Sequence, residues 1–506
     1  MSLFKGKDDQ KTTEATHERQ EKTAPLVSAS INEALDASTD FMFQTIYING
    51  NKEHPVSLFY IDGMADAESI SQNIIRPICE NTFAHVPDSA TVFDWMQHGG
   101  VYRAGVNVRE DFSEVIGDII GGGAALVFDG EQKALVFDVK GFATRSISEP
   151  SEESVLKGSK DCFVESIRVN TATVRRKLRT PNLRLKDAVV GRQSLTPVNI
   201  CYIEGLTNQK LVDEVIKRID QIDVDSAISN ASIEEYISDN KFSTFPQIMV
   251  TERPDKFCEN IVEGRVGIII DGLPTAYIVP GTLNQFLQAP EDYSNSFAYA
   301  SMVRLLRYIV LGISFLLPAF FIAVTQFHPE MIPTQLAISI ANAELEVPFP
   351  MFIQVFLMLF AFEILLEAGL HLPQNIGQAV SIVGSLVVGQ AAVEAKIISP
   401  AVVIVVAATA IAGFTTPDRD FSNSVRLWRF TLVIFAIFEG LLGLSLGILL
   451  LIYSLSKRES FGVPYLSPYV SGELDEVARD TLIRLPMWYH KNRPAALGTG
   501  NVRRRK

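Results

Sequence analysis

The pattern of hydrophobic and polar positions divides the chain into two parts. Up to about position 300, apolar residues come in short runs among charged ones, as in a water-soluble domain. From Tyr308 to Tyr453 long apolar stretches dominate, and 308–327 contains no charge over a length that suits one bilayer crossing. The sequence therefore predicts a soluble N-terminal half followed by an all-α membrane domain with several crossings.

The soluble half contains an internal repeat. "HPVSLFYIDG" from 54 resembles "TPVNICYIEG" from 196, and "GGAALVFDGEQKALVF" from 122 resembles "GRVGIIIDGLPTAYIV" from 264, both pairs lying 142 positions apart. Each copy starts with an apolar strand, continues into a helix and ends in a hairpin with an Asp-Gly turn or its equivalent. We predict an α+β or α/β half built from two copies of one unit, about 52–150 and 194–290.

Composition and repeat together predict the domain organisation. The first residues are too polar to bury a core, which predicts a disordered tail. A connector between the copies carries Arg175, Arg176, Lys177 and Arg179, either as a solvated helix face or as a contact with anionic headgroups or an acidic partner. The predicted segments are 1–40 (tail), 41–150 (first copy), 151–193 (basic connector), 194–300 (second copy), 301–455 (membrane domain) and 456–506 (cytoplasmic tail).

The residues expected of an enzyme or a metal site are missing from the sequence. There is no HExxH, GxSxG or P-loop pattern, and the glycines at 121–123 precede a strand, which favours a turn over a phosphate site. The four cysteines have no metal-ligand spacing and are expected to be reduced thiols. A net charge of −13 disfavours nucleic-acid binding. We predict no catalytic residue, no cofactor and no metal.

The number of membrane crossings stays open at this point. Apolar segments at 308–327, 351–370, 375–396, 397–414 and 430–453 suggest four or five helices. Arginines before the first segment place the soluble half in the cytoplasm, and the basic C-terminal tail argues for the same side and an even number. One central segment would then be re-entrant or fail to span. The same count, however, leaves the arginines at 419, 426 and 429 outside.

Polar side chains inside the apolar segments are the candidate functional residues. A carboxylate at the bilayer centre costs roughly 2.5–3.5 kcal/mol, so such groups usually face a bundle interior or a water-filled path. Alternatively, groups near segment ends reach the headgroups, and small or amide residues join helices. Glu439 suits a helix or subunit contact equally well. The candidate pathway residues are Glu363, Glu367, Gln378, Ser381, Ser385, Gly389, Gln390 and Glu394.

A known family shares long stretches with this chain. They include "FSTFPQIMVTERPDK" (242–256), "FGVPYLSP" (461–468), "RLPMW" (484–488), "EPSEESVLKGSKDCFVE" (149–165) and above all the region from "PFPMFIQVFLMLFAFEILLEAGLHLPQNIGQAV" to "IISPAVVIVV" (348–406). In these stretches the chain resembles the A subunit of the GerA-type spore germinant receptors of endospore-forming bacteria.

That resemblance implies a location, partners and a function. It implies a multi-pass protein of the spore inner membrane with its soluble half in the spore core, working with a transporter-like B subunit and a lipoprotein C subunit. It further implies a ring-shaped, ligand-gated ion channel whose opening releases cations during nutrient-triggered germination. An oligomeric ring also fits the few helices in one chain and the lack of visible inverted repeats. Four alternatives stay open: a paralogous stage V sporulation A-subunit-like channel, an orphan A subunit, a stand-alone secondary transporter, and a signalling scaffold.

Overall fold

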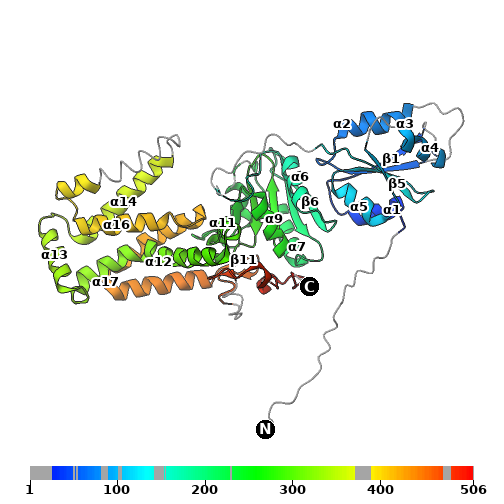
Figure 1. The fold of residues 1–506 in the computed structure, drawn as a ribbon. Coiled ribbons are helices and arrows are strands. Elements are labelled where there is room, and N and C mark those ends of the chain that lie inside the picture. The colour runs from blue at the N-terminus through cyan, green and yellow to red at the C-terminus, as the bar shows by residue number, and fades with distance from the viewer. Residues whose placement is uncertain are drawn as a thin grey trace, which may run out of the picture. The chain divides into compact units, whose positions relative to one another are not determined.

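The computed structural model describes residues 25–48, 52, 55–80, 89–100, 105–141, 153, 155, 157–227, 229, 231–370, 389–470, 480–489 and 491–504. The chain forms two compact units (Figure 1). The first comprises 1–143 together with 178–183, and the second comprises 144–177 together with 184–506. Each unit is described by itself below.

The first unit is built on a five-stranded antiparallel sheet with the strand order β1-β2-β4-β5-β3. Its register includes Leu58 opposite Leu126, and the hairpin β4–β5 turns at the predicted Asp-Gly. The strands are β1 (Phe41–Tyr47), β2 (Pro55–Ile61), β3 (Val106–Arg109), β4 (Ala124–Phe128) and β5 (Lys133–Phe137); the helices are α1 (Ser28–Leu35), α2 (Ala67–Ile70), α3 (Arg76–Glu80), α4 (Ser89–Trp95) and α5 (Phe112–Ile120).

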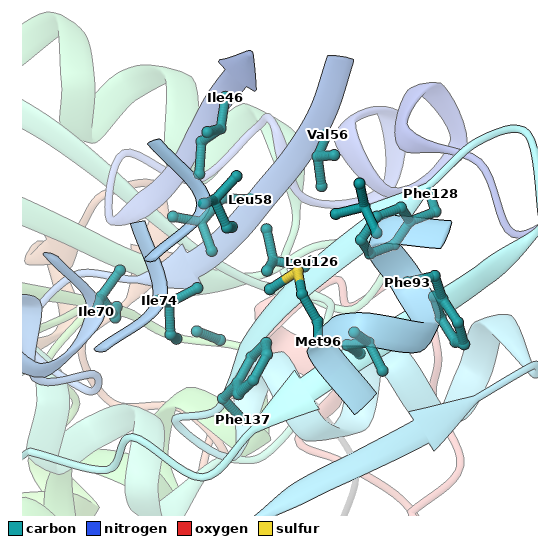
Figure 2. Packing of buried hydrophobic residues seen from close by; sticks show 14 of the residues in the cluster. Ile46, Val56, Leu58, Ile70, Ile74, Phe93, Met96, Leu126, Phe128 and Phe137 are labelled. Atoms are coloured by element: carbon teal, nitrogen blue, oxygen red, sulfur yellow. The ribbon is translucent and has the colours of Figure 1, made fainter. Parts of the chain in front are cut away.

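The core of this sheet follows from the period-two alternation of its strands. In Figure 2 the inward side chains of β2 and β4, such as Leu58 and Leu126, meet Ile70 and Ile74 from the helical segment after β2. Phe93 packs edge-on against Phe128 at a centroid distance of 5.3 Å. All of these residues are buried, so the sheet has one closed apolar face of its own.

The second unit contains a sheet of the same topology, with the order β6-β7-β9-β10-β8. Strand β4 and strand β9 begin at Ala124 and Val266, which are 142 positions apart, as the repeat predicts. The duplicated α/β unit is thereby confirmed. The strands are β6 (Leu183–Val190), β7 (Thr196–Ile203), β8 (Met249–Thr251), β9 (Val266–Ile270) and β10 (Ala276–Val279); the helices are α6 (Ile167–Lys177), α7 (Gln209–Asp220), α8 (Ala231–Ile237), α9 (Pro254–Glu263), α10 (Leu283–Phe286) and α11 (Pro290–Ser294).

The repeat begins earlier in the chain than its sequence similarity indicates. Strand β6 starts at Leu183 and β1 at Phe41, again 142 positions apart, and helices α6 and α1 precede them in the same way. Part of the segment 151–193 is therefore the beginning of the second copy. Its basic cluster is divided: Arg175 is buried and Lys177 lies 2.9 Å from Asp161, both within the second unit, whereas Arg179 is exposed and belongs to the first unit.

The membrane domain contains three helices that are long and apolar enough to cross a bilayer, among the described residues. These are α12 (Phe297–Phe327), α14 (Met351–Leu370) and α17 (Arg419–Ser456), with the shorter apolar helix α16 (Pro400–Gly413) beside them. A further helix, α13 (Thr334–Leu345), follows α12. The predicted segment 375–396 lies largely outside the described residues.

Helix α17 reverses its direction at Gly440. This glycine has φ +57° and ψ −129°, which is not helical. A Cβ built on Gly447 would lie 2.7 Å from the side chain of Leu432, so the residues after the break run back along those before it. The sequence predicts one uninterrupted segment over 430–453, whereas the structure has two legs, 419–439 and 441–456, joined at a glycine that tolerates a positive φ.

The described part of the C-terminal segment packs onto the second α/β copy. Strands β11 (Glu459–Ser460) and β12 (Val463–Pro464) form a hairpin. The Ser460 hydroxyl donates to the Gln247 carbonyl at 2.7 Å and accepts from the Gly281 amide at 3.2 Å. The start of the predicted cytoplasmic tail is thus an ordered part of the second unit.

Candidate functional site

Glu363 lies opposite two arginines of the neighbouring helix. Its carboxylate oxygens are 3.7 Å from Arg426 Nη1 and 3.9 Å from Arg429 Nη1. Glu363 comes from the middle of α14, whereas both arginines come from the first leg of α17. The distances are those of ion pairs without a close hydrogen bond. The carboxylate therefore offsets a local positive charge.

Arg429 is the more deeply buried of the two arginines. Its side chain is 3% exposed. The guanidinium donates from Nε to the Ser314 carbonyl at 2.7 Å and from Nη2 to the Ser314 hydroxyl at 3.2 Å. A buried guanidinium without a counter-charge is strongly destabilising, so Glu363 has a structural function here. Three helices, α12, α14 and α17, meet at this cluster.

Glu367, one turn further along α14, lines a cavity of about 980 Å³. The cavity lies between the ends of α14 and α16, the start of α17 and the second α/β copy. Carboxylates predominate among its charged lining residues, which are Glu153, Glu234, Glu252, Glu367, Asp418 and Asp420 against Arg419 and Arg426. We call this the acidic cavity. A concave surface of one charge sign raises the local concentration of counter-ions, here cations.

The carboxyl groups of the acidic cavity perturb one another. Burial, followed by the nearby carboxylates of Asp420 and Asp418, raises the pKa of Glu234 to about 7. Burial likewise raises the pKa of Asp418 to about 6, although its hydrogen bond from the Phe421 amide and the charge of Lys256 oppose that shift. Part of the cavity's negative charge is therefore titrated near neutral pH.

The remaining described candidates lie apart from this cluster. Gly389 is buried beside Val403 of α16, and a Cβ there would make an ordinary van der Waals contact at 3.4 Å. Gln390 and Glu394 are exposed, and the Gln390 amide donates to the Glu394 carboxylate at 2.9 Å. Gln378, Ser381 and Ser385 lie outside the described residues. Glu439 is exposed next to the break in α17.

A second charged cluster joins α12 to the soluble part of the second unit. Asp292, which is 3% exposed, accepts hydrogen bonds from Arg304 Nε at 2.9 Å and from Arg307 Nη1 at 2.9 Å. Arg304 Nη1 also lies 2.8 Å from Asp480 in the C-terminal segment. Arg304 and Arg307 are the arginines that precede the first apolar segment and indicate membrane sidedness by their charge, and the structure holds both inside the protein.

Three residues that make important contacts in the membrane helices are not predicted from the sequence: Gln354, Arg426 and Arg429. Gln354 is fully buried and bridges two helices: its amide donates to the Phe349 carbonyl at 2.7 Å, and its oxygen accepts from the Ser399 amide at the start of α16 at 2.8 Å. In the sequence, Gln354 stands out only as a single amide side chain within an apolar run. Arg426 and Arg429 appear in the sequence merely as charges flanking a segment. Among the described residues no group of three or more His, Cys, Asp or Glu could hold a metal ion.

Comparisons with known proteins place the chain in a family. Residues 29–496 match the model of the Bacillus/Clostridium GerA spore germination protein family. The chain is 37% identical to Spore germination protein B1 of Bacillus subtilis (strain 168), over 92% of this chain and 95% of that protein. It is 38% identical to Spore germination protein KA of the same organism (95% and 89%) and 31% identical to its Stage V sporulation protein AF (82% and 83%).

Similarity to a solved structure covers part of the chain. It is the crystal structure of the N-terminal domain of the A subunit of the Bacillus megaterium spore germinant receptor GerK3, 28% identical, with a TM-score of 0.38, covering 49% of this chain and 91% of that one. The family match covers far more than half of the sequence, including both α/β copies and the membrane helices. The chain belongs to the Bacillus/Clostridium GerA spore germination protein family.

Proposed function

We propose that the chain is the A subunit of a spore germinant receptor and that several copies form a cation-conducting ring in the spore inner membrane. The observation that carries the proposal is the position of Glu367. Its carboxylate belongs to an apolar helix and lines the acidic cavity. Ionisable residues in membrane segments that border such a cavity mark ion paths, and rings of carboxylates select cations.

In this proposal the acidic cavity is the entrance to the path from the side of the soluble half. Glu363 is the counter-ion that partly offsets the charges of Arg426 and Arg429 beside that path. Gln378, Ser381 and Ser385, together with Gly389, Gln390 and Glu394, are proposed to continue it in the assembled ring. The exposure of Gln390 and Glu394 in the single chain leaves both available to neighbouring copies.

The proposal includes the partners and the membrane sidedness. We propose that the protein acts with the B and C subunits of a germinant receptor and that its soluble half faces the spore core. The contact between the C-terminal segment and the second α/β copy supports placing both on one side of the membrane. Higher identity to Spore germination proteins B1 and KA than to Stage V sporulation protein AF favours a receptor subunit over that paralogue.

Cation flux through liposomes that contain the purified chain tests this function. Glu367→Gln should lower the cation flux and the preference for cations over anions, because it removes one carboxylate per copy from the entrance. Glu439→Gln is the matched control, since it makes the same change at an exposed position beside the break in α17. Equal flux in both variants would contradict the path along Glu367. A monomer in detergent and in the bilayer would contradict the ring and favour a stand-alone transporter.

A further inference from the structure

A second cavity, apolar and separate from the acidic one, lies where the membrane helices meet the second α/β copy. Its volume is about 370 Å³. Helix α12 contributes Leu311, the two legs of α17 contribute Val425 and Leu451, and the soluble part contributes Leu287. The C-terminal segment contributes Leu466. Four parts of the second unit thus share one apolar wall.

The polar atoms of the aromatic lining residues are already occupied. The hydroxyl groups of Tyr308 and Tyr469 lie 2.8 Å apart, and the Tyr308 hydroxyl also donates to Asn284 at 3.2 Å. Trp428 donates its indole N–H to the Thr244 hydroxyl at 3.0 Å. A buried water needs two or more polar partners, so the cavity is unsuitable for water.

An apolar cavity of this size is expected to bind an apolar molecule. Protein interiors contain few voids larger than a water molecule, and an unfilled apolar cavity lowers stability in proportion to its volume. Apolar cavities bind apolar molecules instead. No side chain of the lining offers a charge that would hold a carboxylate or a phosphate inside.

The bilayer is the source of such an occupant. The lining residues of α12 and α17 belong to two of the helices that are long and apolar enough to cross a membrane. Next to them, large apolar side chains are exposed, with Leu305 and Ile309 on α12 at 52% and 56% and Ile452 on α17 at 51%. In a bilayer this exposed apolar surface would contact lipid acyl chains, which would then lie beside the cavity.

We propose that the cavity binds one acyl chain of a membrane phospholipid, whose headgroup stays outside. The chain would fill the space between the legs of α17, α12 and the soluble part, and would join these parts as a side chain does in a core. We commit to a phospholipid because the bilayer around helices α12 and α17 would supply phospholipid acyl chains. The proposal depends on the membrane location of the helices and is independent of ion conduction.

Trp428 in the cavity wall reports on the occupant. The full chain with Trp95→Phe and Trp488→Phe keeps Trp428 as its single tryptophan. We expect phospholipids with brominated acyl chains to quench its fluorescence in the detergent-solubilised protein. Val425→Phe and Leu451→Phe, two independent changes that fill the cavity, should each remove most of that quenching. Ile404→Phe enlarges an exposed position of α16 and serves as the control with unchanged quenching.

Two results would overturn the proposal. One is equal quenching in the control and in both filled variants, which would place the brominated chains on the outer surface alone. The other comes from solvent extraction of the purified chain after loosely bound lipid has been washed away with detergent: fatty acid without phosphorus in the extract would identify a free fatty acid as the occupant. Phosphorus retained by the parent chain and the Ile404→Phe variant, and lost from both filled variants, supports a phospholipid.

Discussion

The carboxylate of Asp292 is the group on which the connection between α12 and the soluble part most depends. It accepts from Arg304 Nε and from both Nη1 and Nη2 of Arg307, at 2.9 to 3.1 Å. All three side chains are buried: the side chain of Arg304 is 1% exposed and that of Asp292 is 3% exposed. Asp292→Asn keeps the size of the side chain but leaves two guanidinium groups without this carboxylate.

The expected cost follows from the partners that remain. Removing one member of a buried ion pair costs roughly 3–5 kcal/mol. Arg304 keeps Asp480 at 2.8 Å, and Arg307 keeps the Leu287 carbonyl at 2.6 Å, so the lower end applies. A loss of about 3 kcal/mol changes the equilibrium of this connection by roughly a hundredfold. For a cooperative block of 150–250 residues it corresponds to a fall in Tm of about 6 °C or more.

Thermal unfolding of the purified full chain in detergent, followed by fluorescence, measures this effect. Glu291→Gln is the matched control, because it makes the same chemical change one position earlier in α11. If the loss arises from uncompensated arginines, adding Arg307→Met to Asp292→Asn should restore part of the Tm. A Tm for Asp292→Asn equal to that of the control, or a further fall in the double variant, would refute the reasoning.

Two further predictions concern α17 and the acidic cavity. Gly447→Leu should lower the Tm more than Gly447→Ala does, because a side chain there overlaps Leu432 of the other leg; equal shifts in the two variants would argue against close contact of the legs. The raised pKa of Glu234, about 7, makes its neutral form the one that favours the folded state. Stability should therefore fall by about 3 kcal/mol as pH rises from about 4.3 through 7, and Glu234→Gln should flatten that dependence in unfolding measured across pH. A parent protein whose Tm is constant over this range would exclude the effect.

The duplicated fold is predictable from the sequence because its signal is a repeat. Two matches at one spacing fix the copies, and the Asp-Gly turns fix the hairpins. The first elements of each copy are harder to find. Strand β1 reads "FMFQTIY" and β6 reads "LRLKDAVV", with little in common, although they occupy equivalent places in the two sheets. The equivalence of β1 and β6 is therefore visible in the sheet topology but not in the side chains.

The reversal of α17 is invisible to hydropathy for a physical reason. Both legs face the same apolar surroundings, so the apolar run continues through the turn, and length alone then indicates one long helix. The signal lies in Gly440, Gly443 and Gly447, whose spacing lets two helix backbones approach closely. A Cβ on Gly443 would overlap the carbonyl of Phe435, which shows how tight the approach is.

The candidate site is predictable in its residue types but not in its pairing. Glu363 and Glu367 are recognisable because carboxylates are rare in apolar helices. The sequence, however, does not indicate that Glu363 faces arginines more than sixty positions away while Glu367, one turn on, faces the acidic cavity. Such pairings depend on how α14 packs beside α17, and hydrophobic periodicity specifies only which faces are apolar.

The hairpin in α17 also bears on the sidedness of the membrane domain. Phe421 near its start and Leu455 near its end line the same apolar cavity as Leu287 of the soluble part. Both ends of the hairpin therefore lie next to the second α/β copy, and so does the C-terminal segment. The arginines at 419, 426 and 429 and the basic C-terminus are both expected on the cytoplasmic side. These two expectations conflict only if a single crossing separates the two groups. With two legs between them the conflict of charges disappears, and we propose that all of these residues share the side of the soluble half and that the number of crossings is even.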